Sequence, residues 1–284
     1  MNMFNMTYLV RLSFMSAFLF LLSACSKDDE QGPPNNENSG IQVQSSGNFG
    51  NVLTDKDGRT LYFFSLDANG SSACIDGCEA IWPVYYSAEA SSDTEINQED
   101  IDVITRADGS KQSTYKGWPL YYYASDEKAG DIKGDGVNSI WFVAKPDYVL
   151  MVVNNQLIGA DGNHYKEDLS IGDGVTQYFT DNEGRTLYSF APDKFNKNTF
   201  TKEDFSNDAI WPIYQTAVGP LPSIINKDLV ASINVFGKTQ LTYQGWPLYY
   251  FGQDMKRGDN KGVSFPQPRI WPIVNLNTAV APAN

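Results

Sequence analysis

The sequence predicts an all-β protein built from two tandem homologous modules, each made of two sub-repeats of about 60 residues. Two long segments recur in the same order at nearly the same spacing. Asp-Gly and Glu-Gly turns between short apolar runs predict hairpins. After the first 24 residues, no stretch of twelve or more residues has a convincing helical period. The alternative is one closed ring of four units, but the module spacing is longer than is usual for propeller blades.

The duplication is visible in two sequence matches. The segment Thr54–Tyr62 (TDKDGRTLY) returns as Thr180–Tyr188 (TDNEGRTLY), 126 residues later. The segment Thr114–Tyr122 (TYKGWPLYY) returns as Thr242–Tyr250 (TYQGWPLYY), 128 residues later. Chance does not account for two matches of this length in the same order, so one module is a copy of the other.

Each module is itself two-fold, because four sub-repeats share the pattern Tyr-x-aromatic-x-x-Asp and each closes on a tryptophan. The two aromatic residues fall on one face of a strand. The aspartate falls at the strand end, where a carboxylate can accept backbone N–H groups. We therefore favour a structural role over the alternative, in which four carboxylates face a ligand. The motif residues are Tyr62, Phe64 and Asp67; Tyr121, Tyr123 and Asp126; Tyr188, Phe190 and Asp193; and Tyr249, Phe251 and Asp254, with Trp82, Trp141, Trp211 and Trp271 closing the sub-repeats.

These patterns resemble the family of secreted lipoprotein repeats that is characterised by the Tyr-x-(Phe/Trp/Tyr)-x-x-Asp motif. The resemblance rests on GWPLYYY and GWPLYYF, on CIDGCEAIWP and on two Gly-Asp-x-Lys-Gly loops (130–134 and 258–262), and it covers residues 45 to 280. It implies a location outside the cytoplasm but no reaction, because no activity is established for the family. The third sub-repeat departs from the pattern: counted back from its tryptophan, it has Glu203 and Asn207 in place of Cys74 and Cys78.

The first 24 residues have the features of an export signal. Arg11 is their only charged residue, and the apolar run from Leu12 to Leu22 is too short to span a bilayer. The run ends in Leu22-Ser23-Ala24-Cys25, which resembles the lipobox of bacterial lipoproteins. That resemblance implies that Cys25 carries acyl chains such as palmitate and anchors the protein to a membrane. The alternative is an ordinary secretory signal.

The acidic cluster Ser26–Glu30 resembles the surface-export signal of Bacteroidetes lipoproteins, which implies an outer-membrane lipoprotein at the cell surface. The alternatives are a solvated linker without an address and a periplasmic location. Residues 31–40 are rich in Pro, Asn and Gly and predict a flexible spacer. The expected organisation is a signal peptide over 1–24, a lipidated tether over 25–44, a first module over 45–153 and a second module over 154–284.

Turn signals predict where the strands lie. Hairpins are expected around Gly58, Asp108-Gly109 and Gly184. A buried strand over 148–153 is expected to turn at Asn154-Asn155 into a second strand over 156–159, forming a hairpin that joins the modules. Short helical turns are expected near residues 97–102 and 201–205.

The composition argues against nucleic-acid binding, because the net charge is −13 and no basic cluster interrupts the acidic excess. No GxSxG, HExxH or P-loop motif occurs, and the lone His164 lies between the modules, so we do not expect an enzyme. A glycosidase-type carboxylate pair stays open. We expect a non-catalytic protein that binds a glycan or an envelope protein, or that scaffolds the envelope. Trp118 and Trp246 are the candidate ligand-binding aromatics.

No cofactor is expected, and calcium is the best ion hypothesis. Asp131, Asp135 and Asn138 offer oxygen ligands within one Gly-rich loop, although a solvated turn is the alternative. We expect Cys74 and Cys78 to form a disulfide, because a close pair outside the cytosol is usually oxidised. The alternative function is an electron-transfer or metal-binding accessory of the envelope that uses this pair.

Overall fold

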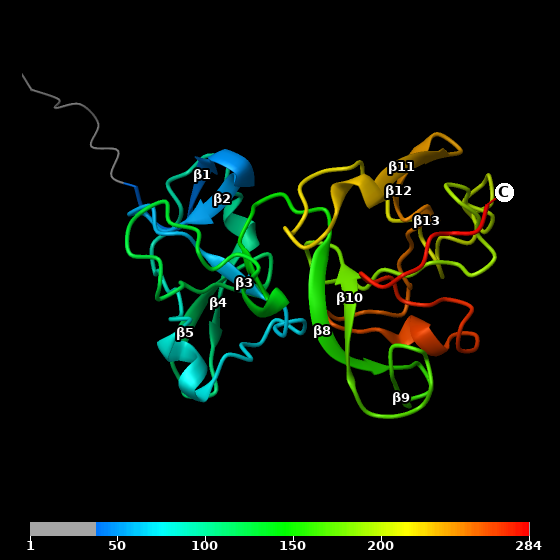
Figure 1. Cartoon of the computed structure of the whole chain (residues 1–284), viewed down its shortest axis with the longest axis horizontal. Helices are drawn as coiled ribbons and strands as arrows, with labels where there is room; N and C mark the ends of the chain where they lie inside the picture. The colour runs from blue at the N-terminus through cyan, green and yellow to red at the C-terminus, as the bar shows by residue number, and fades with distance from the viewer. Residues whose placement is uncertain (1–37, 284) are drawn as a thin grey trace, which may run out of the picture. The chain divides into compact units, whose positions relative to one another are not determined.

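The computed structural model describes residues 38–283, which contain strands and 3-10 turns but no α-helix. The all-β prediction is confirmed, whereas the predicted signal peptide, Cys25 and the tether up to residue 37 lie outside the described residues. The strands (Figure 1) are β1 Gln42–Ser46, β2 Gly50–Thr54, β3 Tyr62–Phe64, β4 Ile101–Thr105, β5 Lys111–Tyr115, β6 Trp118–Pro119, β7 Trp141–Val143, β8 Met151–Ile158, β9 His164–Tyr165, β10 Val175–Thr180, β11 Val230–Val235, β12 Lys238–Tyr243 and β13 Trp246–Pro247. The 3-10 turns are Gly47–Phe49, Asp76–Ala80, Gln98–Asp100, Val137–Ser139, Lys227–Leu229 and Lys261–Ser264.

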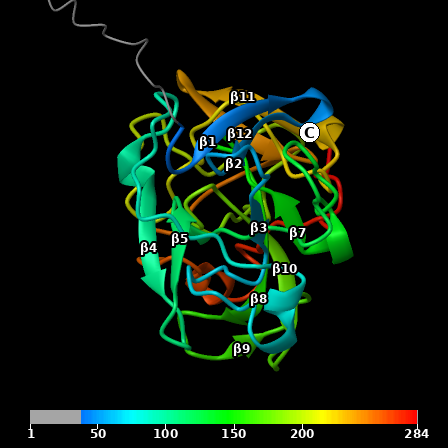
Figure 2. The same ribbon diagram turned by 90° about the vertical axis from the view of Figure 1, so that its left-hand side faces the viewer.

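The two modules share two sets of strand pairings, whereas β3 with β7 forms a sheet only in the first module. A hairpin opens each module, formed by β1 with β2 and by β8 with β10. A three-stranded antiparallel sheet follows, in the order β4-β5-β6 and then β11-β12-β13. In both sheets the Trp-Pro strand lies beside the end of the middle strand, so that Trp118 pairs with Tyr115 and Trp246 with Tyr243. Figure 2 faces the first module, with β1 and β2 at the top and β4 and β5 on the left.

The predicted turn at Asn154-Asn155 is wrong, because β8 continues through both residues. Asn154 is held from the side, where its backbone N–H donates to Ser65 O at 2.9 Å and its amide donates to Ser65 Oγ at 2.7 Å. The chain reverses only at Asp161-Gly162, where Gly162 has a φ of +78°. Asparagine pairs are typical of turns, but here lateral hydrogen bonds keep the pair within a strand.

The connection from β8 to β10 is the main difference between the modules. The residues between β1 and β2 are only 47–49, whereas those between β8 and β10 are 159–174 and include β9. This longer connection is fixed to the last sub-repeat, since Ile158 N–H donates to Asn260 Oδ1 at 2.5 Å and Ala160 N–H donates to Lys261 O at 3.0 Å. The second module therefore carries an insertion that the first lacks.

A stack of four aromatic rings forms the centre of each module. In the first, Trp82 and Trp141 lie parallel with ring centroids 3.8 Å apart, Phe64 covers Trp141 at 3.9 Å, and Tyr123 covers Trp82 at 4.3 Å. Each motif aromatic thus covers the tryptophan of the other sub-repeat. The second module repeats this crossed order with Phe190, Trp271, Trp211 and Phe251, at successive spacings of 4.5, 3.8 and 4.5 Å. Stacked rings bury large apolar area with specific geometry, so neither sub-repeat can complete this core alone.

Replacing Trp271, which is 1% exposed, by alanine should lower the free energy of unfolding by about 3–5 kcal/mol. The substitution removes an inner ring of the second stack and leaves a cavity. Denaturant titration followed by circular dichroism measures the change. Met255 is 79% exposed, so Met255→Ala is the control. It should change the free energy of unfolding by no more than about 0.5 kcal/mol. Equal effects of the two substitutions would contradict the assignment of Trp271 to the core.

Candidate functional site

The motif tyrosine of each sub-repeat donates a hydrogen bond to the motif aspartate of the other sub-repeat in its module. Tyr62 Oη donates to Asp126 Oδ2 at 2.6 Å, and Tyr121 Oη donates to Asp67 Oδ2 at 2.6 Å. Tyr62 and Tyr121 also exchange backbone N–H···O bonds of 2.8 and 3.1 Å. The second module repeats the exchange: Tyr188 donates to Asp254 at 2.5 Å and Tyr249 donates to Asp193 at 2.7 Å.

The other carboxylate oxygen of each motif aspartate holds the loop that follows its strand. Asp67 Oδ1 accepts the N–H of Ala73 at 2.6 Å, and Asp126 Oδ1 accepts the N–H of Lys133 at 2.9 Å. The equivalent donors in the second module are Thr199 for Asp193, at 2.7 Å, and Lys261 for Asp254, at 2.9 Å. All four carboxylates therefore use both oxygens within their own module, in two crossed pairs.

Burial raises the pKa of the motif carboxyls. The pKa of Asp67, which is 0% exposed, is raised to about 7, and that of Asp254 to about 6. Burial also raises the pKa of Asp126 and Asp193. The hydrogen bonds from the tyrosine hydroxyls act in the opposite direction and favour the charged form. The aspartates are thus held in place by the fold, and their burial lowers the stability of the folded state as rising pH deprotonates them.

A second carboxylate site was not predicted, although its residues lie in the longest sequence match. In the turn after β2, Asp55 Oδ1 accepts the N–H groups of Asp57 and Arg59, and Asp55 Oδ2 accepts the hydroxyl of Tyr122 at 2.8 Å. The guanidinium of Arg59 lies over the Tyr122 ring, 4.1 Å from its centroid. Asp181, Arg185 and Tyr250 repeat this arrangement in the second module, with the guanidinium 4.2 Å from the ring centroid. The recurring Thr-Asp-x-x-Gly-Arg segment was the available signal.

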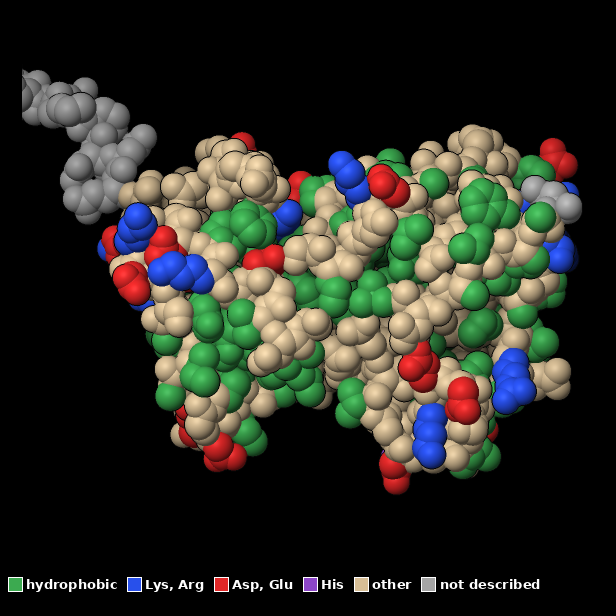
Figure 3. Space-filling view, in the orientation of Figure 1, with side chains coloured by type: hydrophobic (Ala, Val, Ile, Leu, Met, Phe, Trp, Pro, Cys, Tyr) green, Lys and Arg blue, Asp and Glu red, His purple; other side chains and the backbone are tan. Residues whose placement is uncertain are grey.

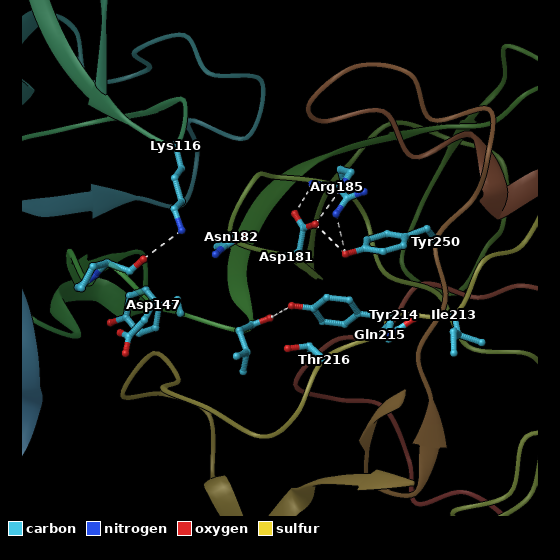
Figure 4. Close-up of a pocket in the computed structure, with 13 residues that line it drawn as sticks. Lys116, Asp147, Asp181, Asn182, Arg185, Ile213, Tyr214, Gln215, Thr216 and Tyr250 are labelled. Atoms are coloured by element: carbon cyan, nitrogen blue, oxygen red, sulfur yellow. Dashed lines mark hydrogen bonds and ion pairs between the residues drawn. The ribbon is translucent and has the colours of Figure 1, made fainter. Parts of the chain in front are cut away.

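A cleft of about 550 Å³ lies where the second copy of this carboxylate site meets the first module (Figure 4). Its walls come from the end of β5, the segment that joins the modules, the Asp181 turn and the segment after Trp211. Tyr214 Oη donates to the carbonyl of Val149 at 2.5 Å and thereby ties the joining segment to the second module. The lining residues are Lys116, Pro146, Asp147, Tyr148, Val149, Asp181, Asn182, Arg185, Ile213, Tyr214, Gln215, Thr216 and Tyr250.

The charges around the cleft are mostly held by protein partners. Arg185 Nε donates to Asp181 Oδ2 at 2.8 Å, and Arg185 Nη2 donates to the Tyr250 hydroxyl at 3.0 Å. Lys116 Nζ donates to the carbonyl of Pro146 at 3.2 Å. The two cations Lys116 and Arg185 are balanced by the two carboxylates Asp147 and Asp181 of the lining. The cleft therefore offers hydrogen-bonding groups without a net charge.

Cys74 and Cys78 form the predicted disulfide, and the second module replaces it by a hydrogen bond. Asn207, which aligns with Cys78, donates from its side-chain amide to the carbonyl of Phe200 at 2.8 Å. Both Cys74 and Phe200 follow, by one residue, the backbone N–H that the motif aspartate holds, so Phe200 and not Glu203 is the structural counterpart of Cys74. The sequence alignment from the tryptophan missed this because the loop of the third sub-repeat is longer.

In the loop predicted to bind calcium, two of the three predicted ligands already contact other groups of the protein. Asp131 Oδ2 lies 3.1 Å from Lys133 Nζ, and Asp135 Oδ1 accepts the N–H of Val143 at 2.9 Å. Asn138 lies in a 3-10 turn with a φ of +52°. Within residues 38–283, no three His, Cys, Asp or Glu side chains gather closely enough to hold a metal ion. Calcium at Asp131, Asp135 and Asn138 stays a prediction.

The expectation that Trp118 presents its ring to a ligand is wrong. The residue is 1% exposed, and the guanidinium of Arg257 from the second module covers its ring at 4.5 Å. Trp246 is partly exposed, and its indole N–H donates to the carbonyl of Ala279 at 2.8 Å. Both tryptophans were candidates from the sequence, which could not show that Trp118 is covered because Arg257 is distant along the chain.

The raised carboxyl pKa values predict that the protein loses stability as pH rises from about 4 to about 7. A carboxyl whose pKa is higher in the folded state holds its proton more tightly there, so its contribution is complete below the unfolded pKa and is lost as pH passes the folded pKa. Denaturant titrations between pH 4 and pH 8 measure this slope. Asp67→Asn should flatten it, because the amide has no proton to lose, whereas the control Gln253→Ala, at an exposed residue that does not titrate, should leave the slope unchanged. A slope that is identical in the wild type and the Asp67→Asn variant would contradict the assignment.

Three segments of the chain, residues 45–85, 102–145 and 234–274, match the model of a family described as a secreted repeat of unknown function. They correspond to the first, second and fourth sub-repeats. The third, which lacks the cysteine pair, lies outside the matched residues. No curated protein and no solved structure is significantly similar to the chain, and none of residues 38–283 forms a helix long and apolar enough to cross a membrane. Three of the four sub-repeats thus match the family of secreted repeats of unknown function.

Proposed function

We propose that the protein is a lipid-anchored protein of the cell surface that binds a neutral, hydroxyl-rich glycan in the cleft between its modules and does not convert it. The family is secreted, which supports a location in the cell envelope. The lipobox-like segment that ends at Cys25 supports a lipid anchor, and the Pro-, Asn- and Gly-rich composition of residues 31–40 supports a spacer between this anchor and the folded part.

The observation that carries the binding proposal is the cleft itself. Its volume of about 550 Å³ falls within the range of pockets for small ligands. Asn182, Gln215 and Thr216 supply amide and hydroxyl groups, and the paired charges of Arg185 and Asp181 supply further donors and acceptors. Sugars present closely spaced hydroxyl groups, each both a donor and an acceptor, which this mixed lining matches better than it matches a charged ligand.

The floor of the cleft is rigid. Tyr214 and Tyr250 pack edge to face with ring centroids 5.2 Å apart, and both hydroxyls are held by protein acceptors. Asp181 is likewise committed, because one oxygen accepts two backbone N–H groups and the other accepts Arg185 and Tyr250. A carboxylate with both oxygens engaged is suited to fixing a surface for binding. This supports a binding role over an acid–base role for the cleft.

On the face that Figure 3 shows, charged side chains lie in a few scattered groups, and hydrophobic side chains cover much of the area between them. The charges of the cleft lining are paired within the protein. The proposal places recognition in the cleft, where amide and hydroxyl groups supply hydrogen-bond donors and acceptors.

Binding is tested with residues 37–284 on an array of envelope and host glycans, followed by calorimetry on the best neutral oligosaccharide. Asn182→Ala and Gln215→Ala should each weaken binding about fivefold to tenfold, because each removes one hydrogen-bonding side chain. Gln253→Ala, an exposed residue outside the cleft, is the matched control and should bind as the wild type does. Unchanged affinity in both cleft variants, or cleavage of the bound glycan, would contradict the proposal.

A further inference from the structure

The Lys-Gly-Trp turn of the first module is covered by the second module. The indole N–H of Trp118 donates to the carbonyl of Asn182 at 2.8 Å. The guanidinium of Arg257 lies over the indole, 4.5 Å from the ring centroid, and also donates to the carbonyl of Lys116. Gly117 makes room for it, since a Cβ there would lie 2.9 Å from the guanidinium. This turn is the surface on which the next module docks.

The equivalent Gln-Gly-Trp turn of the second module is covered by the C-terminal segment of the chain. The indole N–H of Trp246 donates to the carbonyl of Ala279 at 2.8 Å. Ala281 N–H donates to the carbonyl of Gln244 at 2.9 Å, and Gln244 Nε2 donates to the carbonyl of Thr278 at 2.6 Å. Ala281 is 4% exposed.

The second module and the C-terminal segment make the same two hydrogen bonds to the turns that they cover. In each module the indole N–H finds a carbonyl, and the carbonyl of the residue two positions before the tryptophan, Lys116 or Gln244, finds a donor. The C-terminal segment therefore imitates the docking of a third module. Repeat arrays need capping elements that cover an otherwise exposed docking face.

The first module carries an unused copy of the surface that docks on this turn. In the second module that surface is the turn at Asn182 and Gly184 with Arg257, where Gly258 N–H donates to the carbonyl of Gly184 at 3.3 Å. In the first module Gly130 N–H donates in the same way to the carbonyl of Gly58 at 3.1 Å. The neighbouring Lys56 and Asp57 have side chains that are 52% and 67% exposed.

The size of the side chains matches across the two surfaces. On the first docking turn, the large Arg257 fills the space beside Gly117. On the second turn, that space beside Gly245 is filled from within the same module by Phe195, whose ring lies where a Cβ of residue 245 would be. The unused surface of the first module carries the small, exposed Ala129 in the position of Arg257. In the existing contact the large Arg257 lies against the small Gly117. In the contact between two chains, the large Phe195 of one chain would lie against the small Ala129 of the other.

We propose that residues 278–283 form a cap over a module-docking face, and that a second copy of this chain docks there through its turn at Lys56–Gly58 when the cap is displaced. The contact joins two different surfaces, so it propagates head to tail, into a ring where the rotation closes and into an open array where it does not. The capped chain is the monomeric state, and the membrane-tethered copies are candidates for assembly into short arrays.

The test displaces the cap in the soluble unit, residues 37–284, and measures mass by sedimentation over a range of concentrations. Ala281→Glu places a charged side chain at a buried cap position and should cause the mass to rise with concentration beyond that of a dimer. Val280→Glu changes the neighbouring residue, which is 60% exposed, and should stay monomeric. Adding Ala129→Arg to the Ala281→Glu variant should return it to a monomer, because the new side chain meets Phe195.

A second variant covers the case in which Ala281→Glu fails to fold, as judged by circular dichroism. A chain that ends at Asn277 removes the cap, and a synthetic peptide of residues 275–284 should return its assemblies to monomers by occupying the docking face. The same peptide with Ala281→Glu should have no effect. A folded, uncapped chain that stays monomeric at its highest soluble concentration, or assemblies that Ala129→Arg leaves intact, would overturn the proposal.

Discussion

The structure depends on the exchange of partners between the two sub-repeats of each module. A tyrosine hydroxyl from one sub-repeat meets a carboxylate from the other, and an aromatic ring from one covers a tryptophan from the other. A buried carboxylate without donors is costly, and a half stack leaves one face of each indole exposed. Each sub-repeat therefore supplies what the other requires, and neither can complete the centre of its module alone. The same constraint explains why tyrosine, aromatic, aspartate and tryptophan recur together in all four sub-repeats.

Both modules keep the same centre, so the differences between them lie at their edges. The second module carries the long connection around β9, and it holds with Asn207 what the first module holds with a disulfide. It also has Arg257 where the first module has Ala129, and this substitution fastens one module onto the other. The cleft arises from the same joining, since its walls come from both modules. Duplication followed by divergence at the edges thus created a cleft that a single module does not have.

The sequence was sufficient to predict the all-β class, the duplicated modules and the disulfide, because each follows from a local or repeated pattern. It was not sufficient to show that Tyr62 bonds Asp126 rather than its neighbour Asp67, since spacing along a strand says nothing about which strand crosses it. Trp118 was misjudged for the same reason: Arg257, 139 residues away, covers it. The turn expected at Asn154 failed because a lateral contact with Ser65 outweighs the local turn preference. The cleft residues lay within the recognised repeat, but their meeting depends on how the two modules pack.

The most direct test of the crossed exchange is a pair of double-mutant cycles on the free energy of unfolding. The first combines Tyr62→Phe with Asp126→Asn, the partner in the other sub-repeat. The second combines Tyr62→Phe with Asp67→Asn, the aspartate of the same motif. The crossed architecture predicts a coupling of about 1–3 kcal/mol for Tyr62 with Asp126 and one within about 0.5 kcal/mol for Tyr62 with Asp67. A larger coupling within the motif than across it would show that each sub-repeat holds its own carboxylate, and the account would fail.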